Sequence, residues 1–265
     1  MARHVQSNTA MIGVFDSGIG GLTILDALRR RMPRRDFIYL ADTARLPYGS
    51  KPPSSIRDFT AEIIDSLCDL GAEAIVIACN TASAAALPNI RIQCPVPLWG
   101  MVDATVEAAT RAGRMGRVAV IATERTIASG VYQRKLEARG IRVWAQACPA
   151  LVHAVEERSS GAEALLRDYL REIPRVDTLA LGCTHFSLLH TAIERVVGPK
   201  VRVVDGAATL AGSVAAELDN EGAGRVHYLV TGDPARFARA GRIPRSLVEK
   251  TALAQVGRGV EVVHV

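Results

Sequence analysis

The sequence predicts an α/β protein with two pseudo-symmetric, doubly wound, mainly parallel sheet domains and a functional site in the cleft between them. Along the 265 residues, short apolar runs alternate with helical periodicity, which is typical of parallel sheets. Two runs end alike: 75–81 reads Ile-Val-Ile-Ala-Cys-Asn-Thr, and 179–185 reads Leu-Ala-Leu-Gly-Cys-Thr-His. The segments 12–17 and 118–123 form a second pair of apolar runs with polar ends, about 106 positions apart. The chain therefore reads as two related halves.

Apolar periodicity places the elements in order along the chain. The loop over 42–51 contains Pro47, which restricts the backbone, and Gly49, which frees it. An unbroken apolar run such as 75–78 indicates a strand that is buried on both faces. We expect strands at 11–15, 37–41, 75–79, 118–122, 143–147 and 179–182, and helices at about 22–31, 54–70, 80–86, 102–112 and 149–157, with a capped helix start at 123–126.

Prolines at positions 95 and 97 mark the expected boundary between the two domains. The chain is expected to cross back near 203–205, and the apolar segment 226–232 then rejoins the first domain. The predicted domains are 1–97 with 206–265, which carries Cys79, and 98–205, which carries Cys183.

Composition limits the compartment and the class of protein. No segment approaches the roughly 18 consecutive apolar residues of a membrane-spanning helix, so we expect no membrane partner. The first ten residues are polar and contain no apolar export core. The five cysteines are odd in number and include no Cys-x-x-Cys pair, which argues against a disulfide framework or a zinc site. We therefore expect a cytoplasmic protein without a bound metal.

The formal charge of +5 and the pI near 9.1 raise the question of nucleic acid. The densest basic segment is Arg29–Arg31 with Arg34 and Arg35, at the end of a predicted helix, where cations complement the helix dipole. No aromatic residues interleave with these arginines to stack on bases. We interpret the segment as a solvated helix end and expect no nucleic-acid partner.

The two matched cysteines carry the chemical hypothesis. If the two half-sheets face each other, Cys79 and Cys183 lie on opposite walls of one cleft, because ligands bind at the carboxyl ends of parallel strands. A thiol has an ordinary pKa of about 8.5, and a helix N-terminus is expected to lower it. One thiolate can then take a proton from one face of a carbon while the other thiol protonates the opposite face. This inverts a stereocentre without pyridoxal phosphate, any other cofactor or a metal.

Other interpretations of these residues remain open. Cys79 alone could fill the core, and Cys183 beside His185 could form a nucleophile with its base, as in a hydrolase or decarboxylase. A protein that binds a dicarboxylate without catalysis is a further alternative. A single nucleophile would leave the second cysteine motif unexplained. We take Cys68, Cys94 and Cys148 as structural.

Polar residues at the same sheet edge indicate a small anionic ligand. Asp16 can meet an ammonium group or orient a base, and helix N-termini there offer backbone N–H groups. The glycines of 18–21 do not form a dinucleotide loop, because the third glycine of that fingerprint would fall at Thr23. The other polar residues expected at this edge are Ser17, Asn80, Thr81 and Thr184.

Four ordered motifs resemble those of bacterial glutamate racemases, in the cofactor-independent aspartate/glutamate racemase superfamily. They are Phe-Asp-Ser-Gly-Ile-Gly-Gly-Leu at 15–22, Ala-Asp-Thr-Ala-Arg-Leu-Pro-Tyr-Gly at 41–49, Ala-Cys-Asn-Thr-Ala at 78–82 and Leu-Gly-Cys-Thr-His at 181–185. Val-Thr-Gly-Asp-Pro at 230–234 resembles the C-terminal segment of the family. One departure is Phe186-Ser187, which stands where Tyr-Pro is usual.

The resemblance implies interconversion of L- and D-glutamate, with the D form supplying peptidoglycan synthesis. It implies that Cys79 takes the α-proton from D-glutamate, assisted by Asp16, and that Cys183 takes it from L-glutamate, assisted by His185. Glu156 occupies the place of a family glutamate implicated in catalysis, and a surface helix position is the alternative. The sequence does not determine the oligomeric state, and a homodimer is the assembly we consider. The substrate contacts implied are Asp16, Ser17, Tyr48, Gly49, Asn80, Thr81, Thr184 and His185.

Overall fold

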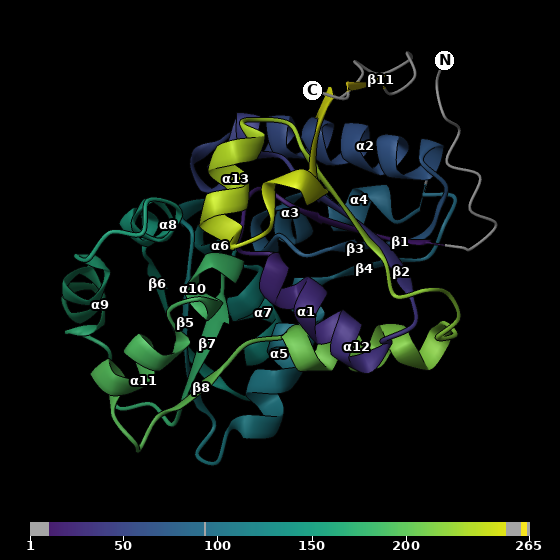
Figure 1. The fold of residues 1–265 in the computed structure, drawn as a ribbon. Coiled ribbons are helices and arrows are strands. Elements are labelled where there is room, and N and C mark those ends of the chain that lie inside the picture. Colours follow the sequence, from purple (N-terminus) through teal and green to yellow (C-terminus); the bar gives the residue numbers. More distant parts are fainter. Residues whose placement is uncertain (1–10, 93, 253–260, 264–265) are drawn as a thin grey trace.

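A computed structural model of the chain describes residues 11–92, 94–252 and 261–263, and within them the strands form two separate sheets (Figure 1). The larger sheet has the order β11-β10-β9-β2-β1-β3-β4, and every pair is parallel except β10 with β11. Its strands are β1 (Met11–Asp16), β2 (Asp36–Ala41), β3 (Ala72–Ile77), β4 (Leu98–Gly100), β9 (Val226–Val230), β10 (Val248–Ala252) and β11 (Glu261–Val263).

The smaller sheet has the order β6-β5-β7-β8 and is parallel throughout. It repeats the order β2-β1-β3-β4 of the larger sheet: the first strand lies between the second and the third, and the fourth follows the third. The expectation of two related, mainly parallel α/β sheets is therefore confirmed. The strands are β5 (Arg117–Ala122), β6 (Arg142–Ala147), β7 (Thr178–Gly182) and β8 (Arg202–Val204).

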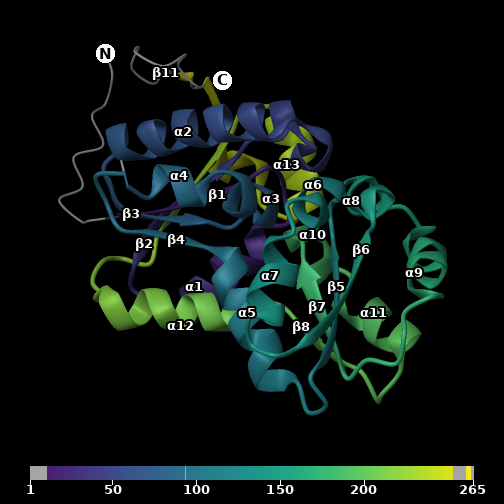
Figure 2. The same ribbon diagram turned by 180° about the vertical axis from the view of Figure 1, so that it is seen from behind.

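Helices cover both faces of the larger sheet (Figure 2). Alternate residues of β1 enter two separate cores: Ile12 and Val14 pack toward one set of helices, and Phe15 packs toward the other. This double burial explains the unbroken apolar runs of the sequence. The first set is α1 (Leu22–Arg31), α12 (Ala207–Glu217) and α13 (Pro234–Gly241), and the second is α2 (Pro53–Asp69), α3 (Asn80–Ala85) and α4 (Leu87–Ile90).

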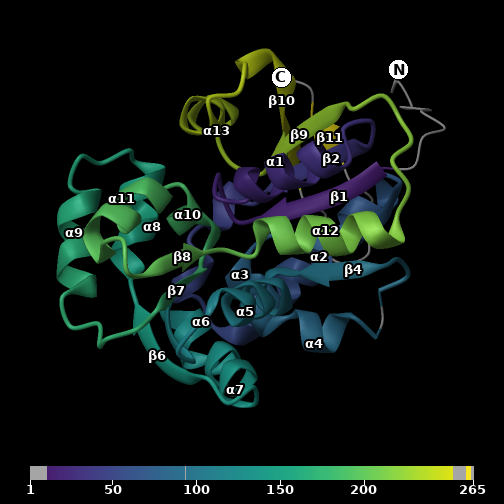
Figure 3. The same ribbon diagram turned by 90° about the horizontal axis from the view of Figure 1, so that it is seen from below.

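The smaller sheet is covered in the same way, and Figure 3 shows its helices as a second lobe beside α12. Val118 and Val120 of β5 pack toward one layer, and Ala119 and Ile121 toward the other. The first layer contains α5 (Met101–Ala112) and α7 (Val131–Glu137); the second contains α8 (Pro149–Glu156), α9 (Ala162–Leu170), α10 (Thr184–Ser187) and α11 (His190–Val197); the short α6 (Glu124–Ala128) follows β5.

Strand pairing moves the expected domain boundary. The residues Leu98–Gly100 form β4, which pairs with β3 in the larger sheet, whereas the sequence assigned them to the second domain. The N–H of Ile75 donates to the carbonyl of Pro97 at 2.9 Å, so pairing begins directly after the proline. The division into two domains remains our proposal, and we place its first boundary after Gly100. The residues 1–10 and 253–260 of the predicted first domain lie outside the described residues.

The chain returns to the larger sheet as the sequence predicted. The strand β9 pairs in parallel with β2, with Phe37 opposite Val226 and Ala41 opposite Val230. This return brings the segment 230–234 to the carboxyl end of the larger sheet. Among the described helices, none is both long and apolar enough to cross a membrane.

The basic segment at the C-terminal end of α1 differs in part from the expectation. Arg29, Arg30, Arg31 and Arg34 are exposed, as a solvated helix end requires, but Arg35 is buried. The Arg35 guanidinium forms ion pairs with Glu73 and with Asp219. A buried cation needs such partners because it has lost its hydration. Arg35 therefore ties β3 to the segment that follows α12.

We expect the substitution Arg35→Ala to lower the free energy of unfolding by about 2 kcal/mol, because it removes charge-assisted hydrogen bonds of a buried guanidinium, while Glu73 and Asp219 remain in contact with water. The matched control is Arg34→Ala, since the Arg34 side chain is exposed. Urea denaturation at neutral pH measures both changes. An equal effect of the two substitutions would show that the ion pairs of Arg35 do not stabilise the fold.

Candidate functional site

Both matched cysteines line a single cavity at the carboxyl ends of the two sheets. The cavity is small, with only about 10 Å³ open to water-sized molecules, which is about the space of one water. Its walls come from both halves of the chain, as the topology of two facing sheets requires. The lining residues are Ser17, Pro47, Tyr48, Gly49, Cys79, Asn80, Thr81, Thr123, Val152, Cys183, Thr184 and His185.

Each cysteine lies between a strand and a helix. Cys79 is the N-cap residue of α3 and Cys183 is the N-cap residue of α10. The strand β3 ends at Ile77, two residues before the predicted end, and the Ala78 N–H still donates to the carbonyl of Phe15 at 2.8 Å. In both sheets, the cysteine follows the third strand in the repeated order. The pairing of the two motifs in the sequence therefore corresponds to equivalent positions in the fold.

The Cys79 thiol lies among neutral and acidic groups. Its Sγ is 3.9 Å from the hydroxyl oxygen of Ser17. Burial, together with the nearby charge of Asp16, raises the pKa of the Cys79 thiol to about 12. The sequence reading expected the start of α3 to lower this pKa. The backbone N–H of Ala82 acts in that direction, but desolvation outweighs it, so this expectation is wrong for this cavity.

Asp16 connects the two halves of the site. Its side chain is fully buried, and it accepts hydrogen bonds from the Gly18 N–H at 2.8 Å and from the Thr184 hydroxyl at 3.0 Å. Thr184 belongs to α10, so this bond links the end of β1 to the helix that begins after Cys183. Burial raises the pKa of Asp16 above its ordinary value, although His185 and the two hydrogen bonds act in the opposite direction.

We call the ionisable groups near each thiol its relay: Asp16 for Cys79, and His185 with Glu156 for Cys183. The Sγ of Cys183 is 3.9 Å from Nδ1 of His185, and Nε2 of His185 is 2.7 Å from Oε1 of Glu156. The same Glu156 oxygen accepts the Ile19 N–H at 3.1 Å. Glu156 is therefore buried at the end of α8, and the alternative of a surface position is wrong. A side chain at position 18 would strike Glu156 and His185, which explains the glycine there.

His185 and Glu156 stabilise each other as an ion pair. Burial acts to lower the pKa of His185, but its contacts with Cys183 and Glu156 outweigh burial and raise that pKa well above its ordinary value. Burial acts to raise the pKa of Glu156, but its hydrogen bond with His185 and the charge of His185 outweigh burial and lower that pKa. At neutral pH the site therefore contains an imidazolium beside Cys183 and a carboxylate behind it.

Three residues that the sequence did not assign to the site also line the cavity, and one of them, Thr123, has a hydroxyl close to two others. Its hydroxyl oxygen is 2.9 Å from those of Thr81 and Thr126, and Thr81 and Thr126 are 3.1 Å apart. A Cβ at position 49 would lie 2.6 Å from Cβ of Thr123, so only a glycine permits this approach. The sequence repeat could have indicated Thr123 as a site residue. The segment 118–123 repeats 12–17, and Thr123 occupies the position that Ser17 has in the first half. Pro47 and Val152 had no such signal.

The residues predicted as substrate contacts gather at the cavity. All of them line it except Asp16, which lies directly behind Thr184. The Asn80 side chain accepts a hydrogen bond from the Tyr132 hydroxyl at 2.5 Å, so its orientation is set by α7. Within the described residues, no three His, Cys, Asp or Glu side chains are grouped as a metal site. Two thiols and several hydroxyl and N–H groups around one small cavity suit proton transfer on a small polar molecule.

We expect the substitution Glu156→Gln to lower the pKa of His185, because it removes the negative partner of the imidazolium. An NMR pH titration of the ring C–H protons measures this pKa. The matched control is Glu157→Gln, since the neighbouring side chain is exposed. An unchanged pKa of His185 in the Glu156 variant would contradict the proposed ion pair.

The same substitution is expected to destabilise the fold most between about pH 4.5 and 6.5. The lowered pKa of Glu156 gives stability that is present above its unfolded value and is lost as the pH falls through its folded value. The raised pKa of His185 gives stability that is present below its unfolded value and is lost as the pH rises through its folded value. Urea denaturation of both proteins across this range measures the difference.

Comparisons with known proteins agree with the site. The sequence profile of the Asp/Glu/hydantoin racemase family matches residues 19–214. The chain is 45% identical to a glutamate racemase of Thermus thermophilus over 239 residues, 86% of this chain and 90% of that protein. It is 41% identical to glutamate racemase of Aquifex pyrophilus over 224 residues, 83% of this chain and 88% of that protein.

Solved structures show the same fold. The Thermus thermophilus glutamate racemase in complex with beta-chloro-D-alanine has a TM-score of 0.80 and 41% identity, covering 97% of this chain and 96% of that chain. The Francisella tularensis enzyme in complex with D-glutamate has a TM-score of 0.78 and 31% identity, covering 89% and 93%. The resemblance seen in the motifs is thereby confirmed. The chain belongs to the Asp/Glu/hydantoin racemase family and is an amino-acid racemase, an isomerase of the glutamate racemase group.

Proposed function

We propose that this enzyme interconverts L- and D-glutamate by proton transfer between Cα and two thiols, without a cofactor. The observation that carries the proposal is that Cys79 and Cys183 line one cavity from equivalent positions in the two halves. Each thiol has its own polar neighbours, Ser17 and Asp16 for one and His185 with Glu156 for the other. A single-nucleophile enzyme would need only one of these arrangements.

The protons and electron pairs balance over one turnover. With D-glutamate, the Cys79 thiolate takes the α-proton, and the Cys183 thiol gives its proton to the opposite face of the carbon. The product is L-glutamate, Cys79 is then a thiol and Cys183 a thiolate. With L-glutamate the roles are reversed, so the same two groups act as base and acid in both directions. An exchange of protons with water or with their relays resets the thiols.

The relays assist the two thiols differently. On the Cys183 side, His185 lies beside the thiol and Glu156 holds the imidazole ring in place. Cys79 is held protonated by burial. Its assistance comes from Asp16, whose raised pKa makes that carboxylate a stronger base for the thiol proton. This difference predicts that Asp16 acts mainly in the D-to-L direction and His185 mainly in the reverse direction.

The polar lining fits the two carboxylates and the ammonium group of glutamate. Hydroxyl and backbone N–H groups of Ser17, Thr81 and Thr184 can bind carboxylates, and Asp16, which lies behind Thr184, places an acidic group on the side where the ammonium group can sit. Two relatives support this substrate, because one was solved with D-glutamate and the Escherichia coli enzyme was solved with L-glutamate and its activator. The small cavity has space for about one water, so the two halves must separate for glutamate to enter.

The cellular role follows from the family. We propose that the enzyme works in the cytoplasm and supplies D-glutamate for peptidoglycan synthesis, with a homodimer as its assembly. These three proposals rest on the relation to glutamate racemases rather than on the site itself.

Incubation of L- and D-glutamate separately in deuterated water tests the mechanism. We expect the wild-type enzyme to racemise both enantiomers and to introduce deuterium at Cα. Cys79→Ser and Cys183→Ser are each expected to lower racemisation by about 10²–10⁴-fold, the usual contribution of a general acid or base. Circular dichroism and proton NMR measure the two outcomes.

The matched control for this experiment is Cys148→Ser. Cys148 is also a buried N-cap residue after a strand of the smaller sheet, but it does not line the cavity. Its variant is expected to racemise glutamate at a rate close to that of the wild type. Full turnover by either the Cys79 or the Cys183 variant would refute the two-thiol mechanism.

A further inference from the structure

The loop after β2 forms one wall of the cavity, and the proposed mechanism does not explain what holds it in place. We call this loop, Thr43–Lys51, the lip. It contains two short 3-10 turns, Thr43–Arg45 and Tyr48–Ser50, and it reaches the cavity through Pro47, Tyr48 and Gly49. Gly49 touches Thr123 of the other half, so the position of the lip decides the shape of the cavity.

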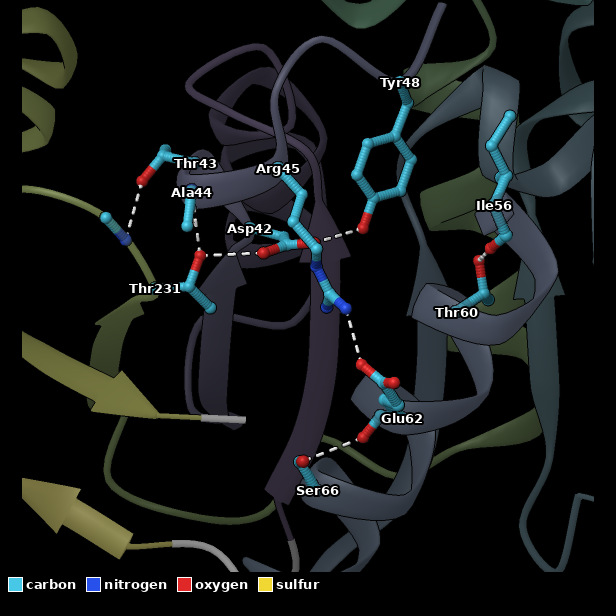
Figure 4. Close-up of polar contacts among 11 residues, drawn as sticks. Asp42, Thr43, Ala44, Arg45, Tyr48, Ile56, Thr60, Glu62, Ser66 and Thr231 are labelled. Carbon is cyan, nitrogen blue, oxygen red and sulfur yellow. Dashed lines mark hydrogen bonds and ion pairs between the residues drawn. The ribbon is translucent and has the colours of Figure 1, made fainter. Parts of the chain in front are cut away.

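Asp42, at the root of the lip, has three side-chain partners (Figure 4). It is fully buried and accepts hydrogen bonds from Nε of Arg45 at 2.6 Å, from the hydroxyl of Tyr48, and from the hydroxyl of Thr231 at 2.7 Å. Its backbone N–H donates to the carbonyl of Asp16 at 2.9 Å. Asp42 therefore joins the lip, the end of β1 and the segment after β9 at one point.

Thr231 lies in the Val-Thr-Gly-Asp-Pro segment at 230–234, which has no role in the proposed proton transfer. Its hydroxyl donates to Asp42 and accepts the Ala44 N–H at 3.0 Å. Its backbone N–H donates to the carbonyl of Ala41 at 3.1 Å, and the Gly232 N–H donates to the hydroxyl of Thr43 at 3.1 Å. The lip and the segment after β9 therefore each donate a backbone N–H to a threonine hydroxyl of the other.

The outer part of the lip is held by contacts with α2. The guanidinium of Arg45 bonds to Glu62 at 2.5 Å and lies 4.1 Å from the centre of the Phe59 ring. The ring of Tyr48 lies 5.8 Å from that of Phe59 and 6.1 Å from that of Phe15. Burial and Asp42 raise the pKa of Tyr48, so its hydroxyl remains a donor at working pH.

We propose that Asp42 and Thr231 are a positioning pair that holds the lip in the place where Tyr48 and Gly49 bind glutamate. The inference rests on the proposed function, because it requires the lip to contact the substrate. Neither residue lines the cavity, so they act through the lip and not on the reacting carbon. Loss of the pair lets the lip relax away from Thr123, which weakens substrate binding and leaves the thiols and their relays in place.

The substitution Thr231→Val removes the hydroxyl and keeps the side-chain shape. We expect the KM for both enantiomers to rise about ten-fold, because a hydrogen bond to a charged group is lost, while kcat changes less than two-fold. Thr231→Ser retains the hydroxyl and is expected to restore the wild-type KM. Steady-state kinetics in both directions, at a temperature where circular dichroism shows each variant to be folded, measure this split.

The matched control is Thr60→Val. Thr60 is a buried threonine of α2 whose hydroxyl donates to the Ile56 carbonyl of its own helix at 2.6 Å (Figure 4). This variant is expected to lose stability without a change in KM. Should Thr231→Val fail to fold, Thr43→Val replaces it as the test. Thr43 is half-buried, and its substitution removes the hydrogen bond from the Gly232 N–H to the Thr43 hydroxyl, so the KM of this variant is expected to rise several-fold.

Three results would overturn the positioning pair. The first is a KM within two-fold of the wild type in the folded Thr231→Val variant, or in Thr43→Val where that variant takes its place. The second is a rise in the KM of Thr60→Val as large as that of Thr231→Val. The third is a KM of Thr231→Ser as high as that of Thr231→Val. The failure of the proposed function has a different signature. A wild-type enzyme that does not racemise glutamate refutes the function, whereas normal racemisation with an unmoved KM refutes only the positioning pair.

Discussion

The whole site depends on the carboxyl ends of two parallel sheets facing each other across one cavity. The hydroxyl of Thr184 donates to Asp16 across that interface, so the end of β1 and the start of α10 are held together by a buried hydrogen bond. Because the order β2-β1-β3-β4 is repeated as β6-β5-β7-β8, the cysteine that follows β3 and the cysteine that follows β7 arrive at the same cavity. Two thiols 104 positions apart in the chain thereby line one cavity.

The electrostatics of the site are dominated by desolvation. Burial raises the pKa of Cys79 and of Asp16, and only in the relay behind Cys183 do specific contacts outweigh it. The ion pair of His185 and Glu156 is buried, and such a pair persists because each partner satisfies the other. The two thiols are therefore symmetric in position but not in charge. The mechanism that we propose is compatible with this asymmetry, because each thiol would serve as the base in only one direction.

Most of the site could be predicted from residue order, because motifs at strand ends converge wherever parallel strands share an edge. Cys79, Cys183, Ser17, Thr184 and their neighbours belong to this group. The position of Glu156 could not be predicted, since a glutamate at the end of a helix reads alike whether it is exposed or buried. The pairing of β4 with β3 could not be predicted, because the three residues of β4 are too few to show a strand pattern. The burial of Arg35 was missed because its partners, Glu73 and Asp219, are far away in the sequence.

The amino-acid sequence by itself determined the fold class, the repeat of two halves and the pair of cysteines, because apolar periodicity and local motifs are properties of short segments. Only the tertiary structure decided the pKa of Cys79, since desolvation depends on everything packed around the sulfur. The tertiary structure alone also decided that Asp42 bonds to Thr231 across 189 positions. No local pattern encodes that contact, which arises where β9 returns to pair with β2.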